Sequence, residues 1–281
     1  MARLLAFILA NRALSAGLAI LTAICIVAVL GPLLVDTALS RVGAVPPRLP
    51  PSQLYPFGTD GQGREMFTVI IVALPQTLKI GVTAGLISLA IGVALGLIAG
   101  FVGGLLDAVI RTASDVMMTI PGIAVMVLIA ANVREMTVTL MAVIIASLSW
   151  MIATRMIRAQ TLSLRDRGYV QIAILNGASP LRLVFVEVLP NLMPFIAASF
   201  VMTVSQAMLA TIGLEALGLG PQNELTLGVT IYWAQFYSAV VRGMWWWWAI
   251  PIGALALIFV GLMLTSIGMD GFVNKRIGVR S

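Results

Sequence analysis

The feature that most constrains this chain is a series of apolar segments, each long enough to cross a lipid bilayer as a helix. About 20 apolar residues span the hydrocarbon core, and such segments occur at residues 13–35, 80–102, 108–131, 136–157, 194–216 and 245–269. They lack the strict alternation of a membrane β-barrel strand. Only 10% of the 281 residues are charged, against about 25% in soluble domains. The sequence therefore predicts an all-α integral membrane protein with six transmembrane helices.

The distribution of basic residues predicts the orientation of these spans. An even number of crossings places both chain ends on one side of the membrane. With the N-terminus inside, eleven Lys and Arg residues fall in cytoplasmic segments and six in outer segments. Because basic residues are enriched in cytoplasmic loops, we expect both termini to be cytoplasmic. Because the Lys and Arg residues cluster on one side of the membrane, they do not indicate a nucleic-acid-binding surface.

Composition shifts divide the chain into four parts. Residues 1–35 are expected to form an N-terminal transmembrane anchor; the alternative is a signal peptide, but the apolar core exceeds the roughly 7–15 residues of such signals. The Pro- and Gly-rich stretch that follows predicts an outer loop, and this loop with nearly all of an interfacial helix at 65–79 makes up residues 36–78. A core domain is expected at 79–270, with a cytoplasmic loop at 158–193. Residues 271–281 form a basic cytoplasmic tail.

Two groups of residues near the span ends have a structural interpretation. Asp107, Arg111 and Asp115 are spaced so that they share one helix face, which predicts an ion-pair ladder along that helix. The alternative is a functional role, because charges within a span are costly. The tryptophans Trp245 to Trp248 lie where an aromatic belt is expected, which predicts interfacial anchors.

Several kinds of chemistry are excluded or disfavoured. The chain has no histidine and one cysteine, Cys25, so the usual general base, the usual transition-metal ligand and an internal disulfide are all missing. We expect no catalytic residue and no metal site. The phosphate-binding pattern Gly-x-x-x-x-Gly-Lys-Ser/Thr is also absent, so ATP hydrolysis needs another subunit. A self-sufficient secondary transporter is the main alternative, although internal repeats typical of that class are not evident.

The most informative segment is the apolar cytoplasmic stretch at 168–194. Helical spacing from Tyr169 to Leu175 is interrupted by Asn176-Gly177-Ala178-Ser179-Pro180. Glycine suits a sharp helix end and proline suits the first turn of the next helix. The pattern predicts a second short helix at 181–188, ended by Leu189-Pro190. Such an apolar elbow either docks on a partner protein or lies on the lipid surface.

This elbow resembles the EAA loop of bacterial ABC importer permeases. Ala173, Gly177, Leu189 and Pro190 match that pattern in spacing, whereas Gln171 and Ile172 stand where the family tends to have Glu and Ala. Further segments are similar to the dipeptide, oligopeptide and nickel permease family, namely YPFGTDGQGRE at 55–65, FVGG at 101–104 with Asp107, Asp115 with Pro121, and LEALGLG at 214–220. The resemblance is to the second of the two permease subunits of these importers.

The resemblance implies a type I ABC importer transmembrane fold in a bacterial or archaeal inner membrane. It implies partners: a homologous second permease, one or two ATPase subunits that bind ATP and Mg, and an extracytoplasmic solute-binding protein. The cargo would be a peptide or a related solute, with no cofactor in this chain. The implied ATPase-coupling residues are Tyr169, Gln171, Ala173, Asn176, Gly177, Ala178, Ser179, Leu189 and Pro190.

Four polar residues in or near the fifth span are candidates for the translocation path. They are Thr203, Ser205, Gln206 and Glu215. In membrane helices such residues also bond to the backbone or to a neighbouring helix. For Glu215 the second interpretation is packing against a loop or the partner permease.

Overall fold

The computed structural model describes residues 11–278, and the regular elements in that range are all helices, apart from an isolated β-bridge between Thr59 and Glu65 in the outer loop. Three helices are long, apolar and continuous: α2 (Arg12–Leu34), α3 (Met66–Val102) and α12 (Trp245–Gly278). A fourth spanning stretch covers Pro180–Ala216 and contains α9 (Pro180–Arg182), η2 (Leu183–Val188) and α10 (Leu189–Ala216). The prediction of an all-helical membrane protein is confirmed.

Two bent pairs of helices are also long and apolar enough to count as candidate spans, so the structure has four candidate spans, or up to six if each bent pair is one span. The first pair is α4 (Gly104–Thr119) and α5 (Gly122–Ala131), bent by 76°. The second is α6 (Val138–Ser147) and α7 (Trp150–Arg165), bent by 48°. The predicted kink at Pro121 is confirmed: Ile120 before it is extended, as steric clash with a proline ring favours.

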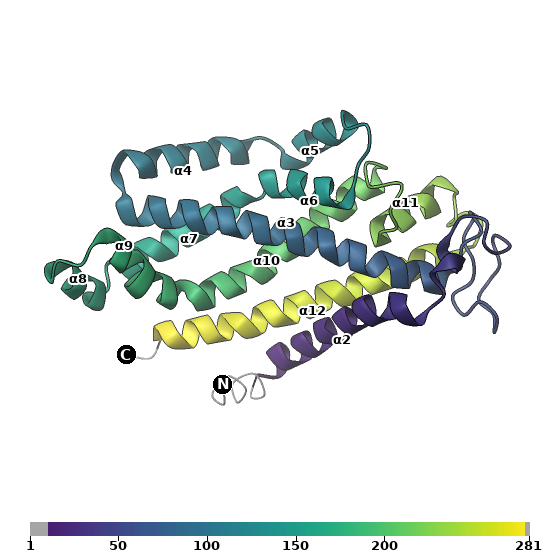
Figure 1. Cartoon of the computed structure of the whole chain (residues 1–281), viewed down its shortest axis with the longest axis horizontal. Coiled ribbons are helices and arrows are strands. Elements are labelled where there is room, and N and C mark those ends of the chain that lie inside the picture. The colour runs from purple at the N-terminus through teal and green to yellow at the C-terminus, as the bar shows by residue number, and fades with distance from the viewer. Residues whose placement is uncertain (1–10, 279–281) are drawn as a thin grey trace.

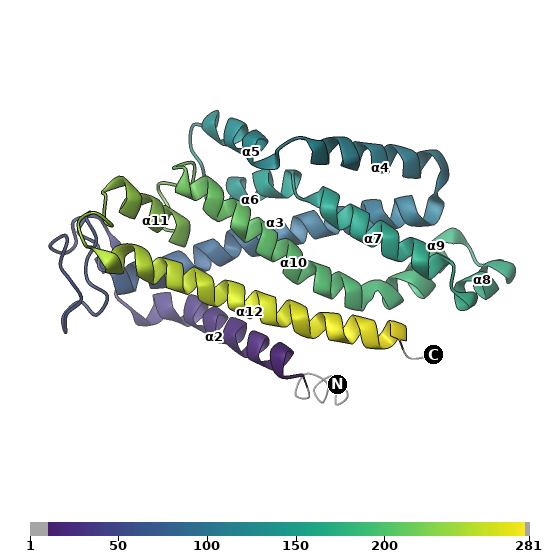
Figure 2. The same cartoon turned by 180° about the vertical axis from the view of Figure 1, so that it is seen from behind.

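The two ends of the bundle carry different elements. Figure 1 shows α8 (Gly168–Leu175), the start of α2 and the end of α12 toward one end, and the outer loop with α11 (Leu227–Phe236) at the other. Figure 2 shows the same arrangement from behind. This agrees with termini and elbow on one membrane side. The sequence beyond Gly278, and residues 1–10 with their basic Arg3, lie outside the described residues.

Small residues let α3 pack closely at the centre of the bundle. Gly92, Gly96 and Gly100 recur every four residues and face Ala153, Ile157 and Thr161 of α7. A Cβ atom at Gly96 would lie 2.7 Å from the Cβ of Ile157. Within lipid the hydrophobic effect does not drive helices together. Van der Waals contacts between closely packed helices therefore contribute much of the free energy of their association.

The predicted interfacial helix at 65–79 is wrong as a separate element. It is the first third of α3, which runs unbroken through Pro75. Met66, Ile70 and Leu74 are buried in one cluster with Trp247, so this segment packs in the bundle instead of lying on the membrane surface. Glu65 caps the helix, accepting from the Thr68 N–H at 2.7 Å. α12 continues as far as Gly278 and so includes most of residues 271–281, the expected tail.

The interpretation of the four tryptophans as surface anchors is wrong for two of them. Trp247 is fully buried and Trp246 nearly so, whereas Trp245 is exposed. The Trp246 indole N–H donates to the Thr59 carbonyl at 3.0 Å. In the same turn Asp60 accepts from the Arg64 Nε at 2.6 Å, with both side chains buried. The outer loop is therefore folded onto the start of α12.

The predicted ion-pair ladder along one helix is also wrong. Asp107 of α4 pairs with Arg158 of α7, and Asp115 lies 3.7 Å from Arg155 of α7. No pair within α4 is formed among the described residues. The charges face a neighbouring helix because α4 and α7 run side by side.

Candidate functional site

The first arm of the elbow is α8, and its end is a Schellman motif. Gly177 has φ +74°, a conformation that glycine adopts without the steric cost of a Cβ. Its N–H donates to the Ile174 carbonyl at 2.9 Å, and the Ala178 N–H donates to the Ala173 carbonyl at 3.1 Å. These are the two bonds of the motif. Ala173 and Gly177, four residues apart, thus take part in the turn that ends α8 and changes the direction of the chain.

The second arm begins where the sequence predicts it. Ser179 caps the new helix by accepting from the Arg182 N–H at 3.4 Å, and Pro180 occupies its first turn. The prediction that Leu189-Pro190 ends this arm is wrong. Pro190 lacks an N–H, but a π-helical segment, η2, precedes it and the Leu189 N–H donates to the Val184 carbonyl. The wider turn carries the helix on into α10 without a break.

The inner side of the elbow is fixed to the bundle. Val170 is fully buried in a cluster with Leu97, Ile157, Val188 and Leu192. The Gln171 Nε2 donates to the Arg165 carbonyl at 3.0 Å. A glutamate at 171 could not donate there, so Gln171 joins α8 to the end of α7. The elbow is held on α3, α7 and α10 together.

The outer side of the elbow exposes large apolar side chains on both arms. Leu175 is 85% exposed and Leu181 is 72% exposed. Further exposed members include Ile172, Phe185 and Val186. Tyr169 lies beside them, and partial burial raises the pKa of its hydroxyl, which remains a hydrogen-bond donor. The ATPase-coupling residues expected from the sequence did not include Leu175, Leu181 or Phe185. The sequence pattern that could have identified them is the presence of apolar residues in a cytoplasmic loop.

The four translocation-path candidates fall into two groups. Thr203 and Glu215 are buried within this chain. The Thr203 hydroxyl donates to the Phe200 carbonyl at 2.9 Å, and the Thr226 hydroxyl donates to Glu215 Oε1 at 2.7 Å, joining α10 to the start of α11. Ser205 and Gln206 instead line a groove of about 440 Å³ between α10 and α12, with the apolar Phe259 and Met263.

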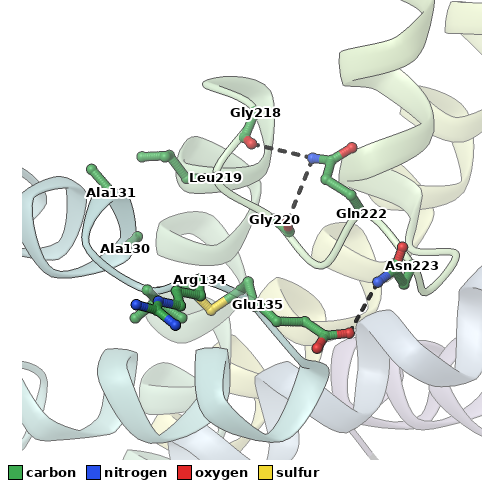
Figure 3. A pocket seen from close by; sticks show the side chains of 11 residues that line it. Ala130, Ala131, Arg134, Glu135, Gly218, Leu219, Gly220, Gln222 and Asn223 are labelled. Atoms are coloured by element: carbon green, nitrogen blue, oxygen red, sulfur yellow. Dashed lines mark hydrogen bonds between the residues drawn. The ribbon is translucent and has the colours of Figure 1, made fainter.

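A second cavity, of about 270 Å³, opens at the end of the bundle that carries the outer loop. Figure 3 shows Arg134 and Glu135 of the α5–α6 connection opposite the loop that follows α10. Asn223 donates to Glu135 at 3.0 Å, and the Gln222 amide donates to the Gly218 carbonyl at 3.2 Å. Among residues 11–278 no group of three or more His, Cys, Asp or Glu side chains is placed to hold a metal ion.

Comparison with known proteins identifies the family. Residues 92–279 match the binding-protein-dependent transport system inner membrane component. The chain is 31% identical over 268 residues to a putative peptide permease protein of Brucella abortus biovar 1 (strain 9-941), covering 95% of this chain and 88% of the relative. It is 28% identical over 268 residues to the dipeptide transport system permease protein DppC of Bacillus subtilis (strain 168), covering 95% and 83%.

A third relative is the oligopeptide transport system permease protein OppC of Mycobacterium tuberculosis (strain ATCC 25618 / H37Rv). It is 27% identical over 263 residues, covering 93% of this chain and 89% of the relative. The family match covers more than half of the chain, including the elbow and the last four spans. The chain belongs to the family of binding-protein-dependent transport system inner membrane components, as a multi-pass, non-catalytic permease subunit of an ABC importer in the inner membrane.

Proposed function

We propose that this chain forms half of the translocation pathway of a peptide importer, and that its elbow transmits movement from separate ATPase subunits. The observation that carries the proposal is the exposed apolar surface of the elbow, defined by Ile172, Leu175, Leu181, Phe185 and Val186. This surface flanks the Schellman turn at Gly177, on the membrane side where both termini are expected. An apolar patch of this kind in water is costly unless a partner covers it.

The proposed assembly contains a second permease of the same family, one or two ATPase subunits that bind ATP and Mg, and an extracytoplasmic binding protein. Peptide cargo is supported by the relatives, whose names describe peptide, oligopeptide and dipeptide permeases. Each partner must bind the two conformations of the permease pair with different affinity, since this difference couples ATP binding to the pathway. Tyr169, Gln171, Ala173, Asn176, Gly177, Ala178, Ser179, Leu189 and Pro190 build or support the elbow in this proposal.

The experiment is an affinity purification of the tagged chain from its native membrane in mild detergent, with co-purifying proteins identified by mass spectrometry. A matched sample carries Leu175→Asp and Leu181→Asp, which place charge on the exposed elbow. We expect the original chain to bring a second permease and ATPase subunits, and the variant to keep the permease but lose the ATPase. A chain that purifies alone would favour a self-sufficient transporter, and equal ATPase recovery would contradict the docking surface.

A further inference from the structure

The paired spans α4–α5 and α6–α7 carry an exposed charged face that the packing of this chain does not use. Asp107 and Arg158 pair with each other and are mostly buried. Arg111, Asp115 and Arg155 remain exposed. The closest nitrogen and oxygen atoms of Arg155 and Asp115 are 3.7 Å apart, and the side chains are 56% and 52% exposed. More than half of each charged side chain therefore faces outward.

These charges lie within two candidate membrane spans, the bent helix pairs α4–α5 and α6–α7. The turn at Gly103 and the end of α7 meet toward the end of the bundle that carries the elbow, where the Arg165 guanidinium lies 6.0 Å from the centre of the Phe101 ring. At a rise of about 1.5 Å per residue, Asp115 is roughly 16 Å along α4 from Gly104, and Arg155 is roughly 15 Å along α7 from Arg165. The pair therefore lies well inside both candidate spans, away from the turn that joins α3 to α4.

The faces of α4 show which side meets lipid. Leu105, Val109 and Val116 are exposed apolar residues on one side of the helix. Arg111 and Asp115, four residues apart, lie on another side of α4, from which Asp115 approaches Arg155 of α7. Charged side chains within a membrane span are strongly disfavoured against lipid and are found facing water-filled cavities or other protein. The apolar side of α4 is therefore the lipid side, and the charged side faces the interior of the assembly.

We propose that Arg111, Asp115 and Arg155 line the water-filled translocation path, where they offer one acidic and two basic contacts to a zwitterionic solute such as a peptide. The inference rests on the proposed function and names the site within it. A carboxylate suits the ammonium end of such a solute, and a guanidinium group suits its carboxylate end. The loose 3.7 Å pair leaves donors and acceptors free for both.

Thiol accessibility in the assembled importer tests this placement. The parent variant is Cys25→Ser, which removes the chain's one cysteine. Asp115→Cys and Arg155→Cys are compared with Val116→Cys, which has the same depth but a different direction on α4. Proteoliposomes of the complex react with the anionic 2-sulfonatoethyl and the cationic 2-(trimethylammonio)ethyl methanethiosulfonate. We expect residues 115 and 155 to react at least about tenfold faster than 116, because a reactive thiolate forms where water reaches it.

The charge of the reagent reports the chemistry of the site. Asp115→Cys leaves the two guanidinium groups beside the new thiol, so the anionic reagent should react about tenfold faster than the cationic one, relative to their rates with free 2-mercaptoethanol. Arg155→Cys retains Asp115 and should lose most of that preference. Equally slow reaction at 115, 155 and 116 would overturn the inference. ATP-dependent peptide uptake by the Cys25→Ser complex separately tests the proposed function, which survives if uptake persists.

Discussion

The guanidinium group of Arg158 donates two hydrogen bonds to the carboxylate of Asp107 and so joins α7 to α4. Nη2 of Arg158 lies 2.7 Å from Oδ2 of Asp107, and Nε donates to Oδ1. The side chains are 22% and 19% exposed. α4 also packs against α3, and this ion pair adds a charged connection between α4 and α7.

Replacing Asp107 by Ala should lower the free energy of unfolding by roughly 1.5–3 kcal/mol, the usual contribution of hydrogen bonds to charged groups. The double-mutant cycle with Arg158→Ala should show most of that loss as coupling. The cycle of Asp115→Ala with Arg155→Ala is the matched comparison, and should give about 0–1 kcal/mol because that pair is exposed. Urea unfolding in detergent measures both cycles, and equal coupling energies would contradict the difference.

Gly177→Ala should weaken the link between ATP hydrolysis and uptake. At φ +74° a Cβ costs about 1–2 kcal/mol, which favours other turn conformations. Gly177→Pro should abolish coupling while the chain still inserts, since it also removes the N–H that donates to Ile174. The measurement is uptake per ATP hydrolysed in membrane vesicles. Gly122→Ala, in open space at a negative φ, is the control. Normal uptake by Gly177→Pro would exclude the elbow as the coupling element.

Gly96→Ala should destabilise the bundle by about 1–3 kcal/mol, the usual cost of overpacking. Its new Cβ would lie 2.7 Å from Ile157 Cβ and 2.9 Å from the Thr154 carbonyl oxygen, so α3 and α7 must separate. Gly253→Ala on the exposed side of α12 meets no atom within 4 Å and should leave stability unchanged. Thermal unfolding in detergent compares the two. A similar midpoint for both would show that α3 and α7 tolerate wider spacing.

The sequence predicts features that depend on neighbours along the chain. Apolar length alone locates the spans, and Gly177 with Pro180 locates the elbow, because turn geometry is local. Contacts between residues that are distant in the sequence cannot be predicted in this way. Asp107 and Arg111 have the spacing of a helical pair, and only the packing of α4 on α7 brings Arg158, 51 residues away, to Asp107. For the same reason the burial of Trp247 depends on the outer loop and α3, which no local pattern around Trp245–Trp248 encodes.

Trp246→Phe should loosen the outer loop while leaving the spans intact. The substitution keeps an aromatic ring against Gly58 but removes the indole N–H that donates to the Thr59 carbonyl. A buried carbonyl left without a donor costs about 1–3 kcal/mol. Amide hydrogen exchange should therefore accelerate in residues 46–65, with exchange in α3 and α10 unchanged. Trp245→Phe is the control, because Trp245 is exposed. Unchanged exchange in the loop of the Trp246 variant would mean that the Asp60–Arg64 turn holds it without this bond.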